Sequence, residues 1–99
     1  MTNVTELKTS YNGHPDWTHW NVSLWLHNDE EWYVPFNVVA ELCARGRITV
    51  GTGAEELKEI LPSFTPDGAE LTKEIIEYYL HDAMIEIMYR ELKAAGKAE

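Results

Sequence analysis

The chain has 99 residues, of which 44% are hydrophobic, enough for one domain with a modest core, expected to span residues 1–99. Seventeen Asp and Glu against eight Lys and Arg give a formal net charge of -9, which disfavours direct binding to nucleic acid. The single cysteine, Cys43, excludes an internal disulfide, and no segment approaches the roughly 20 apolar residues of a membrane span, so we expect a cytoplasmic protein.

The first expected helix is rich in tryptophan. Residues 1–14 mix polar and turn-forming residues and are expected to form an N-terminal arm. Asp16 suits an N-cap, and from Trp17 to Leu26 large apolar side chains recur at helical spacing around more than half of the circumference. The segment 27–30 is expected to end this helix, because its polar and acidic residues suit a new N-cap.

The middle of the chain predicts a second helix and a short connector. Pro35 is tolerated only in a first helical turn, so this helix is expected to run from near Val34 to Gly46. Residues 47–51 contain the β-branched run Ile48-Thr49-Val50 and lead into a glycine-containing segment, which predicts either a minor strand, or hairpin, or an extended connector.

The last third of the chain predicts a short helix and then a long one. A helix of at most two turns is expected over residues 54–61, because Pro62 stops it. Residues 65–68 have the composition of a turn. The longest helix is expected over residues 69–94, and residues 96–99 are expected to form a frayed tail. The expected fold is therefore mainly α, a compact bundle of four to five helices with a long C-terminal helix.

The long helix carries a broad apolar stripe made of two neighbouring rows. These rows are Leu71, Ile75, Tyr79, Ala83 and Ile87, and Ile76, Leu80, Met84, Met88 and Leu92. Ten apolar residues on one helix exceed what a small core is expected to cover. An alternative function follows, namely a regulatory or structural module that forms a homodimer through residues 69–94.

The histidines and the glycine-containing segment, which are candidates for a metal site and a phosphate site, lack the spacing that such sites require. His19 and His27 are eight positions apart, which does not suit a zinc pair. The segment 51–53 lacks the Lys-Ser/Thr pair of a P-loop and precedes glutamates that would repel phosphate, so we interpret it as a simple turn. We expect no enzymatic activity, no metal and no cofactor; a metal-dependent hydrolase using the acids of 29–31 ranks last.

Acidic and aromatic side chains remain as candidates for binding another protein. Trp32 and Tyr33 follow the expected helix break among acids, so Trp32 is the tryptophan expected to be exposed as an interface anchor, although core packing is the more common role of tryptophan. The acids could form one electronegative face or simply keep the chain soluble. The expected partner-binding residues are Asp29, Glu30, Glu31, Trp32, Tyr33, Glu55, Glu56, Glu59, Glu70, Glu74 and Glu77.

A family resemblance lies in the stretch that runs from Tyr11-Asn12-Gly13 through Asp16-Trp17-Thr18-His19-Trp20-Asn21-Val22-Ser23-Leu24-Trp25-Leu26-His27-Asn28-Asp29-Glu30. It resembles a signature, roughly N-Y-x-T-W-N-V-x-L-W-I-x-N-D, of small phage and mobile-element proteins of unknown activity. The order Trp17-Thr18-His19-Trp20 departs from that signature by shifting the first aromatic residue relative to Thr. Thr65-Pro66-Asp67-Gly68 looks like a second, weaker feature of the same family. The resemblance implies an inhibitor of host defence, such as an anti-CRISPR or anti-restriction protein.

The leading functional hypothesis combines this resemblance with the charge. A stoichiometric inhibitor needs no catalytic residues and gains from negative charge when its target grips nucleic acid. We therefore expect a non-enzymatic, phage-encoded protein that acts in the host cytoplasm. Its expected partner is the basic surface of a nucleic-acid-binding defence complex.

Overall fold

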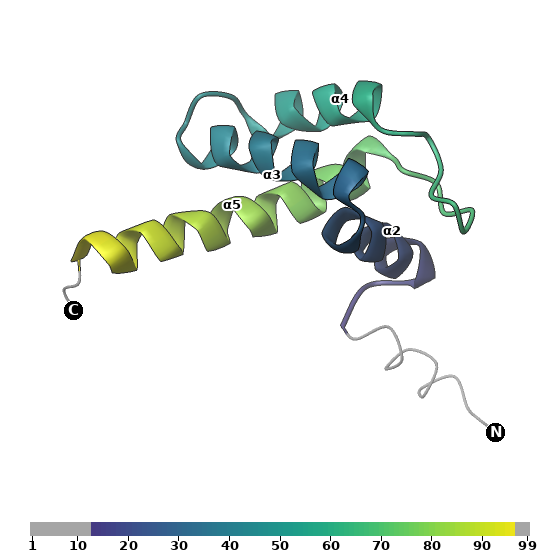
Figure 1. The fold of residues 1–99 in the computed structure, drawn as a ribbon, viewed down its shortest axis with the longest axis horizontal. Helices are drawn as coiled ribbons and strands as arrows, with labels where there is room; N and C mark the ends of the chain where they lie inside the picture. Colours follow the sequence, from purple (N-terminus) through teal and green to yellow (C-terminus); the bar gives the residue numbers. More distant parts are fainter. Residues whose placement is uncertain (1–12, 97–99) are drawn as a thin grey trace.

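The computed structural model describes residues 13–96, with side chains up to residue 94, and four helices form within them (Figure 1). They are α2 (Trp17–Asn28), α3 (Glu30–Ala44), α4 (Val50–Ile60) and α5 (Lys73–Gly96). α5 packs against both α3 and α4, and α2 packs mainly against α3. The predicted mainly α bundle with a long C-terminal helix is confirmed. Residues 1–12 of the expected arm and 97–99 of the expected tail lie outside the described residues.

Two aspartates define the ends of α2. Asp16 is its N-cap, and Asp16 Oδ1 accepts a hydrogen bond of 2.9 Å from the backbone N–H of His19. Asp29 ends α2, since its N–H donates to the Trp25 carbonyl, and its side chain accepts from the N–H of Glu31 to cap α3. The predicted cap at Asp16 and the predicted break after α2 are both confirmed.

α3 begins four residues before the expected position near Val34, with Pro35 inside the helix. Proline lacks an N–H, so the helix forgoes the bond that residue 35 would donate to the carbonyl of Glu31. The Asp29 cap and the burial of Trp32 and Phe36 offset this cost, because both aromatic side chains enter the core from these first two turns.

Gly46 follows the end of α3, as its sequence position suggested. Its φ of 75° lies in the left-handed region that glycine tolerates best. Its N–H donates to the Cys43 carbonyl, and the N–H of Arg47 donates to the Leu42 carbonyl. This paired closure is a Schellman motif, which reverses the chain toward α4.

α4 is longer than predicted and takes the place of the minor strand considered for residues 47–51. Thr49 is its N-cap, with Thr49 Oγ1 accepting from the N–H of Thr52 at 3.1 Å, so Val50 is already helical. The helix has 11 residues rather than two turns, and its first turn contains the glycine pair that we interpreted as a simple turn. The Thr49 cap sets the early start, and Gly53 lets α4 approach α3 and α5 closely.

A tight reversal between α4 and α5 shortens the long helix at its N-terminal end. The N–H of Thr65 donates to the Ala69 carbonyl and the N–H of Leu71 donates to the Ser63 carbonyl, at 2.8 and 2.7 Å. Because residues 69–71 pair with 63–65, α5 begins at Lys73 rather than at residue 69. Within residues 13–96 this pairing amounts to an isolated antiparallel bridge and no strand forms.

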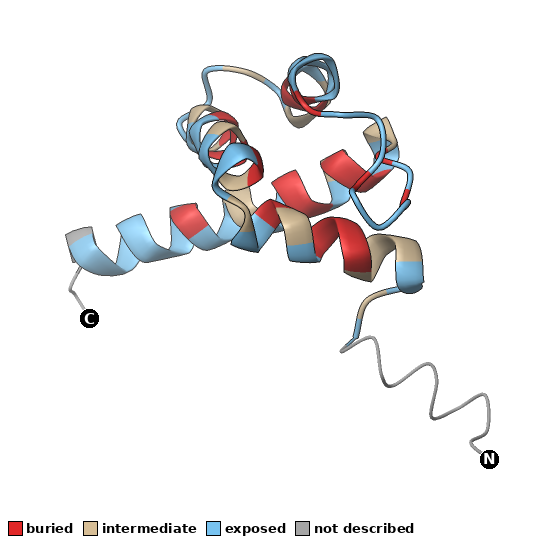
Figure 2. Cartoon of the chain, turned by 45° about the vertical axis from the view of Figure 1, so that its right-hand side comes forward, coloured by how far each residue is buried: buried red, intermediate tan, exposed pale blue. Residues whose placement is uncertain are grey.

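The core lies between the first half of α5 and the inner faces of the other three helices (Figure 2). Its largest fully buried apolar side chains are Phe36, Leu26, Leu57, Leu71, Ile76, Leu80 and Val22. The distal part of α5 extends beyond this core, and its surface is mostly exposed (Figure 2). The apolar stripe predicted for the long helix is therefore covered at one end and uncovered at the other.

Candidate functional site

The structure joins the acids of α4 to those of α5 through one lysine. Lys73 Nζ lies 3.2 Å from Glu55 Oε2 and 3.7 Å from Glu77 Oε2. The glutamates raise the pKa of Lys73, with its hydrogen bond to Glu55 the largest cause. We call the set Glu55, Glu56 and Glu59 of α4, Glu70 of the reversal before α5, and Glu74 and Glu77 of α5 the α4/α5 acidic face; all six are exposed except the half-buried Glu77.

A shallow, open groove of about 550 Å³ borders the α4/α5 acidic face. Its lining residues are Val50, Glu74, Glu77, Tyr78, His81 and Asp82. Three carboxylates beside a tyrosine ring and a histidine suit a cationic side chain better than an anion. The lining of the groove is therefore acidic and partly aromatic.

The other predicted acids, 29–31, lie at the α2–α3 junction on a different pair of helices. The Asp29 carboxylate is used as a helix cap. Glu30 and Glu31 are exposed in the first turn of α3, where negative charge is favourable next to the helix N-terminus. Capping and helix stabilisation account for these three acids.

The expectation that Trp32 is an exposed anchor is wrong. Its side chain is only 4% exposed and belongs to the core, with its ring centroid 6.3 Å from that of Trp25. Tyr33 is half-buried. Trp17, 39% exposed, is the most accessible tryptophan, because the first turn of α2 lies at the edge of the bundle.

A polar cluster that the sequence patterns did not predict joins α2 to the turn before α5. Asn21 Nδ2 and Trp25 Nε1 both donate to Asp67 Oδ2, at 2.9 and 3.0 Å. Thr65 Oγ1 donates to Asn21 Oδ1 at 2.6 Å and accepts from the N–H of Ala69 at 3.0 Å. The hydrogen bonds from Asn21 and Trp25 lower the pKa of Asp67. A sequence signal existed: Asn21 lies among apolar residues of an otherwise buried helix face.

This cluster connects the two segments in which the family resemblance lies. The tryptophan-rich segment supplies Asn21 and Trp25, and the Thr65-Pro66-Asp67-Gly68 turn supplies the hydroxyl and carboxylate that they contact. Asn21 and Thr65 are buried at 2% and 3% exposure with their polar atoms hydrogen-bonded. A buried and satisfied cluster of this kind fixes one packing arrangement, and we assign it to folding rather than to ligand binding.

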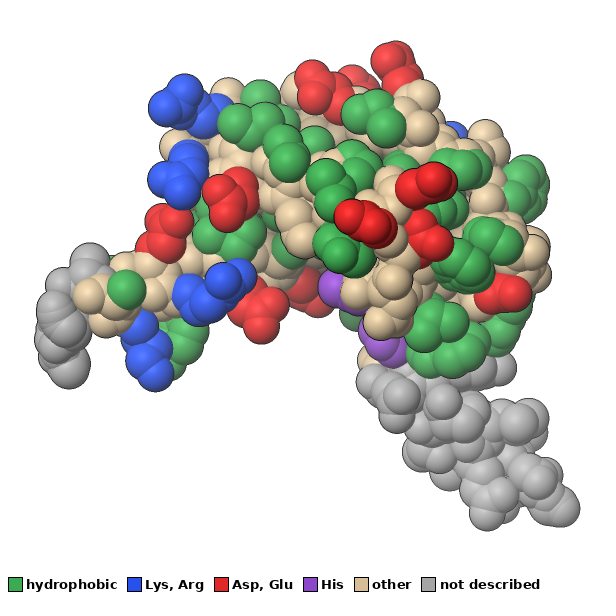
Figure 3. Space-filling model, viewed as in Figure 1, with side chains coloured by type: hydrophobic (Ala, Val, Ile, Leu, Met, Phe, Trp, Pro, Cys, Tyr) green, Lys and Arg blue, Asp and Glu red, His purple; other side chains and the backbone are tan. Residues whose placement is uncertain are grey.

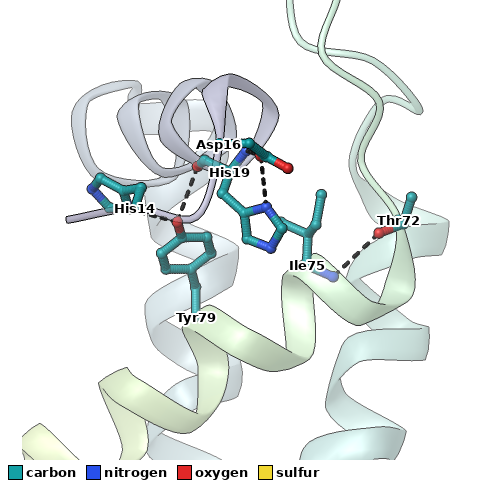
Figure 4. A network of polar contacts seen from close by, with 6 residues as sticks. All are labelled: His14, Asp16, His19, Thr72, Ile75 and Tyr79. Atoms are coloured by element: carbon teal, nitrogen blue, oxygen red, sulfur yellow. Dashed lines mark hydrogen bonds and ion pairs between the residues drawn. The ribbon is translucent and has the colours of Figure 1, made fainter. Parts of the chain in front are cut away.

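A second polar contact holds the start of α2 against α5 (Figure 4). The Tyr79 hydroxyl donates to the His19 carbonyl at 3.1 Å, and His14 Nδ1 lies 2.7 Å from the same oxygen. Since the hydroxyl proton points at His19, the His14 Nδ1 must carry the proton that it shares with Tyr79. Burial raises the pKa of Tyr79 well above its usual value of 10, so the hydroxyl remains a donor.

The remaining candidates for chemistry have structural roles. Burial raises the pKa of the Cys43 thiol, which makes it a poor nucleophile. A Cβ on Gly53 would lie 2.7 Å from Val39 Cγ1, so this glycine serves close helix packing rather than a phosphate loop. Within residues 13–96, no three His, Cys, Asp or Glu residues are grouped so as to hold a metal ion. No helix in this part of the chain is both long and apolar enough to cross a membrane.

Four of the six Lys and Arg side chains in residues 13–94 lie at the opposite end of the molecule from the reversal before α5 (Figure 3). Arg45 is the C-cap of α3 and Arg47 follows it, and Arg90 and Lys93 lie on the distal part of α5. Arg45 is shared between Glu41 and Glu91, at 3.5 and 3.3 Å. Glutamates therefore predominate at the α4–α5 contact, whereas at the opposite end Lys and Arg are mixed with Glu41, Glu86 and Glu91.

The fold and these contacts define a small helical protein, with four helices in residues 13–96, a glutamate-rich region at the α4–α5 contact and structural polar clusters. The chain belongs to a family of unknown function, DUF7249, whose model matches residues 7–95. Comparison with curated proteins and comparison with solved structures each found no match.

Proposed function

We propose that the chain is a non-enzymatic interaction module that binds a basic, nucleic-acid-binding surface of another protein through the α4/α5 acidic face. The observation that carries this proposal is the bridging of Glu55 and Glu77 by Lys73, because it holds acids from two helices on one surface. Residues 55–77, which supply this face, carry six glutamates against two lysines, Lys58 and Lys73. A concentrated negative potential steers association with a positive surface.

The partner that we propose is a protein that binds nucleic acid. A protein that grips nucleic acid presents Lys and Arg along the path of the phosphates, and an acidic surface competes for the same groups. The resemblance to small phage and mobile-element proteins favours a host defence complex of the anti-CRISPR or anti-restriction target type. Inhibition would follow from occupancy alone, since the acidic face needs only to exclude nucleic acid.

The test is capture from a bacterial lysate that contains CRISPR and restriction complexes, followed by competition with duplex DNA. We expect a partner that is released by high salt and by DNA, because both weaken contacts between exposed charges. Reversal of Glu55, Glu56 and Glu59 to Lys should weaken its affinity by about tenfold or more.

In the matched control variant, Glu41, Glu86 and Glu91 are changed to Lys. The net charge changes by the same amount, but these three positions lie outside the acidic face. We expect this control to bind within about threefold of the native chain. Equal loss in both variants would mean that only net charge matters and would refute the acidic face. A partner that DNA does not displace would refute the proposed mode of inhibition.

A further inference from the structure

α5 has a second apolar face that the bundle leaves uncovered. Its residues are Tyr78, Ile85, Met88 and Leu92, which are 44%, 48%, 48% and 71% exposed, together with the exposed His81. We call these five residues the outer stripe. Side chains of this size on one helix face are costly to leave in water, and they mark an interaction surface.

The spacing of the outer stripe is that of a coiled coil. Positions 78, 81, 85, 88 and 92 alternate steps of three and four residues, which is the heptad pattern of a and d positions. The core-facing residues of α5 fall at other heptad positions, for example Ile76, Leu80 and Ile87. One helix therefore carries an inner face that its own bundle buries and an outer seam suited to another helix.

We propose that the outer stripe is the interface of an antiparallel homodimer, in which α5 of one chain packs along α5 of a second copy. In this register Ile85 lies against Met88 of the second copy, and Leu92 lies against His81 of the second copy. The twofold axis falls midway between Ile85 and Met88, so each of these two residue pairs occurs twice in the dimer. The edge contact of His19 on Tyr78, with ring centroids 5.3 Å apart, marks where α2 ends the seam.

The charges along α5 favour a second copy in the antiparallel orientation. The first half of α5 carries Glu74, Glu77 and Asp82 against Lys73, whereas in the distal half Glu86 and Glu91 are balanced by Arg90 and Lys93. Antiparallel packing places opposite halves together and brings Asp82 beside Lys93 of the second copy, on both sides of the axis. Lys93 Nζ lies 5.7 Å from the Tyr89 ring centroid, which keeps it at the edge of the stripe.

A parallel pair would be opposed by the same charges. In parallel heptads a g residue faces the e residue five positions later on the other helix. Here that would place Glu77 against Asp82 of the second copy twice, and like charges at such positions are destabilising. The acidic α5 start thus disfavours the parallel arrangement.

The test is the oligomeric state of the full chain, measured by sedimentation from roughly 1 to 500 µM, since a short seam predicts a Kd on the order of 10 µM. We expect a monomer–dimer equilibrium that Ile85→Glu or Met88→Glu weakens by about tenfold or more. Ile60→Glu is the matched control, because Ile60 is 61% exposed on α4 and lies outside the stripe. Circular dichroism confirms that each variant is folded.

Cysteine cross-linking determines the orientation. His81→Cys mixed with Leu92→Cys should give a mixed disulfide dimer, while His81→Cys alone should not cross-link, because residue 81 faces residue 92 of the second copy. A chain that stays monomeric throughout the concentration range would overturn the proposal, as would a dimer equally stable with Ile85→Glu. Cross-linking by His81→Cys alone would overturn the antiparallel orientation. The dimer would cover Tyr78 and His81, which also line the groove beside the α4/α5 acidic face. The variants separate the two proposals, because Ile85→Glu and Met88→Glu test the dimer, whereas reversal of Glu55, Glu56 and Glu59 tests the acidic face.

Discussion

The amide of Asn21 donates a 2.9 Å hydrogen bond to the carboxylate of Asp67, 46 positions later in the chain. The same Asp67 oxygen accepts from the indole of Trp25, and the other end of the Asn21 amide accepts from Thr65. A single asparagine therefore attaches the turn before α5 to α2. Asn21 and Thr65 are 2% and 3% exposed, whereas Asp67 is exposed, so the attachment runs from the interior of the protein to its surface.

Asn21→Ala should destabilise the fold by about 2–3 kcal/mol, because it leaves the buried Thr65 hydroxyl without its acceptor and opens a small void. Urea unfolding followed by tryptophan fluorescence measures the change. Asn28→Ala is the control, since Asn28 is exposed on the same helix and bonds only the Leu24 carbonyl in its own helix. A loss no larger for Asn21 than for Asn28 would show that the cluster does not contribute to stability.

The stability of the protein should depend on pH through Asp67. Its pKa lies below the ordinary value of 3.8, with the hydrogen bond from Asn21 the largest cause and that from Trp25 the second. A depressed pKa means that the stabilisation is complete above pH 3.8 and is lost as the pH falls through the folded-state pKa. Asp67→Asn should therefore flatten the dependence of the unfolding midpoint on pH in this acid range. Carboxyl NMR of Asp67 should show its titration below 3.8, and a titration above that value would contradict the assignment.

Gly53→Ala should destabilise the protein by about 1–3 kcal/mol, because the new methyl group would lie 2.7 Å from Val39 Cγ1 and 3.2 Å from Leu80 Cδ1. Gly51→Ala in the same helix is the matched control, since its nearest neighbour is Glu77 Oε2 at 3.6 Å. There alanine should be neutral or stabilise by up to about 1 kcal/mol, because it favours helix over the unfolded chain. Thermal unfolding of the two variants compares them directly. Equal effects would refute close packing as the role of Gly53.

Trp32→Ala should destabilise the fold by about 3–5 kcal/mol, which is the cost of removing a large aromatic side chain from a core. Trp17→Ala, at a position 39% exposed, should cost clearly less than Trp32→Ala. Differential scanning calorimetry of both variants distinguishes a core residue from a surface anchor. A Trp32 variant of native stability would restore Trp32 as an interface residue.

The helices follow from local patterns that the sequence displays directly. Aspartates at positions 16 and 29 suit N-caps, and apolar spacing near 3.6 residues identifies the helices that follow. Where α3 begins was harder to predict, because Pro35 argues locally for a first turn. The burial of Trp32 and Phe36 decides otherwise, and burial is a property of the packed protein.

The same distinction between local sequence patterns and tertiary packing applies to the candidate site. The charge of -9 and the acids of α4 and α5 were evident from the sequence, and so was the excess of apolar residues on the long helix. Only tertiary structure decided that Lys73 joins Glu55 to Glu77, and that Ile85 and Met88 remain exposed while Ile76 and Leu80 are buried. Caps and periodicity act between neighbours along the chain, so a sequence shows them. Contacts between α4 and α5, or between Asn21 and Asp67, depend on how helices pack, and that is decided by the whole core at once.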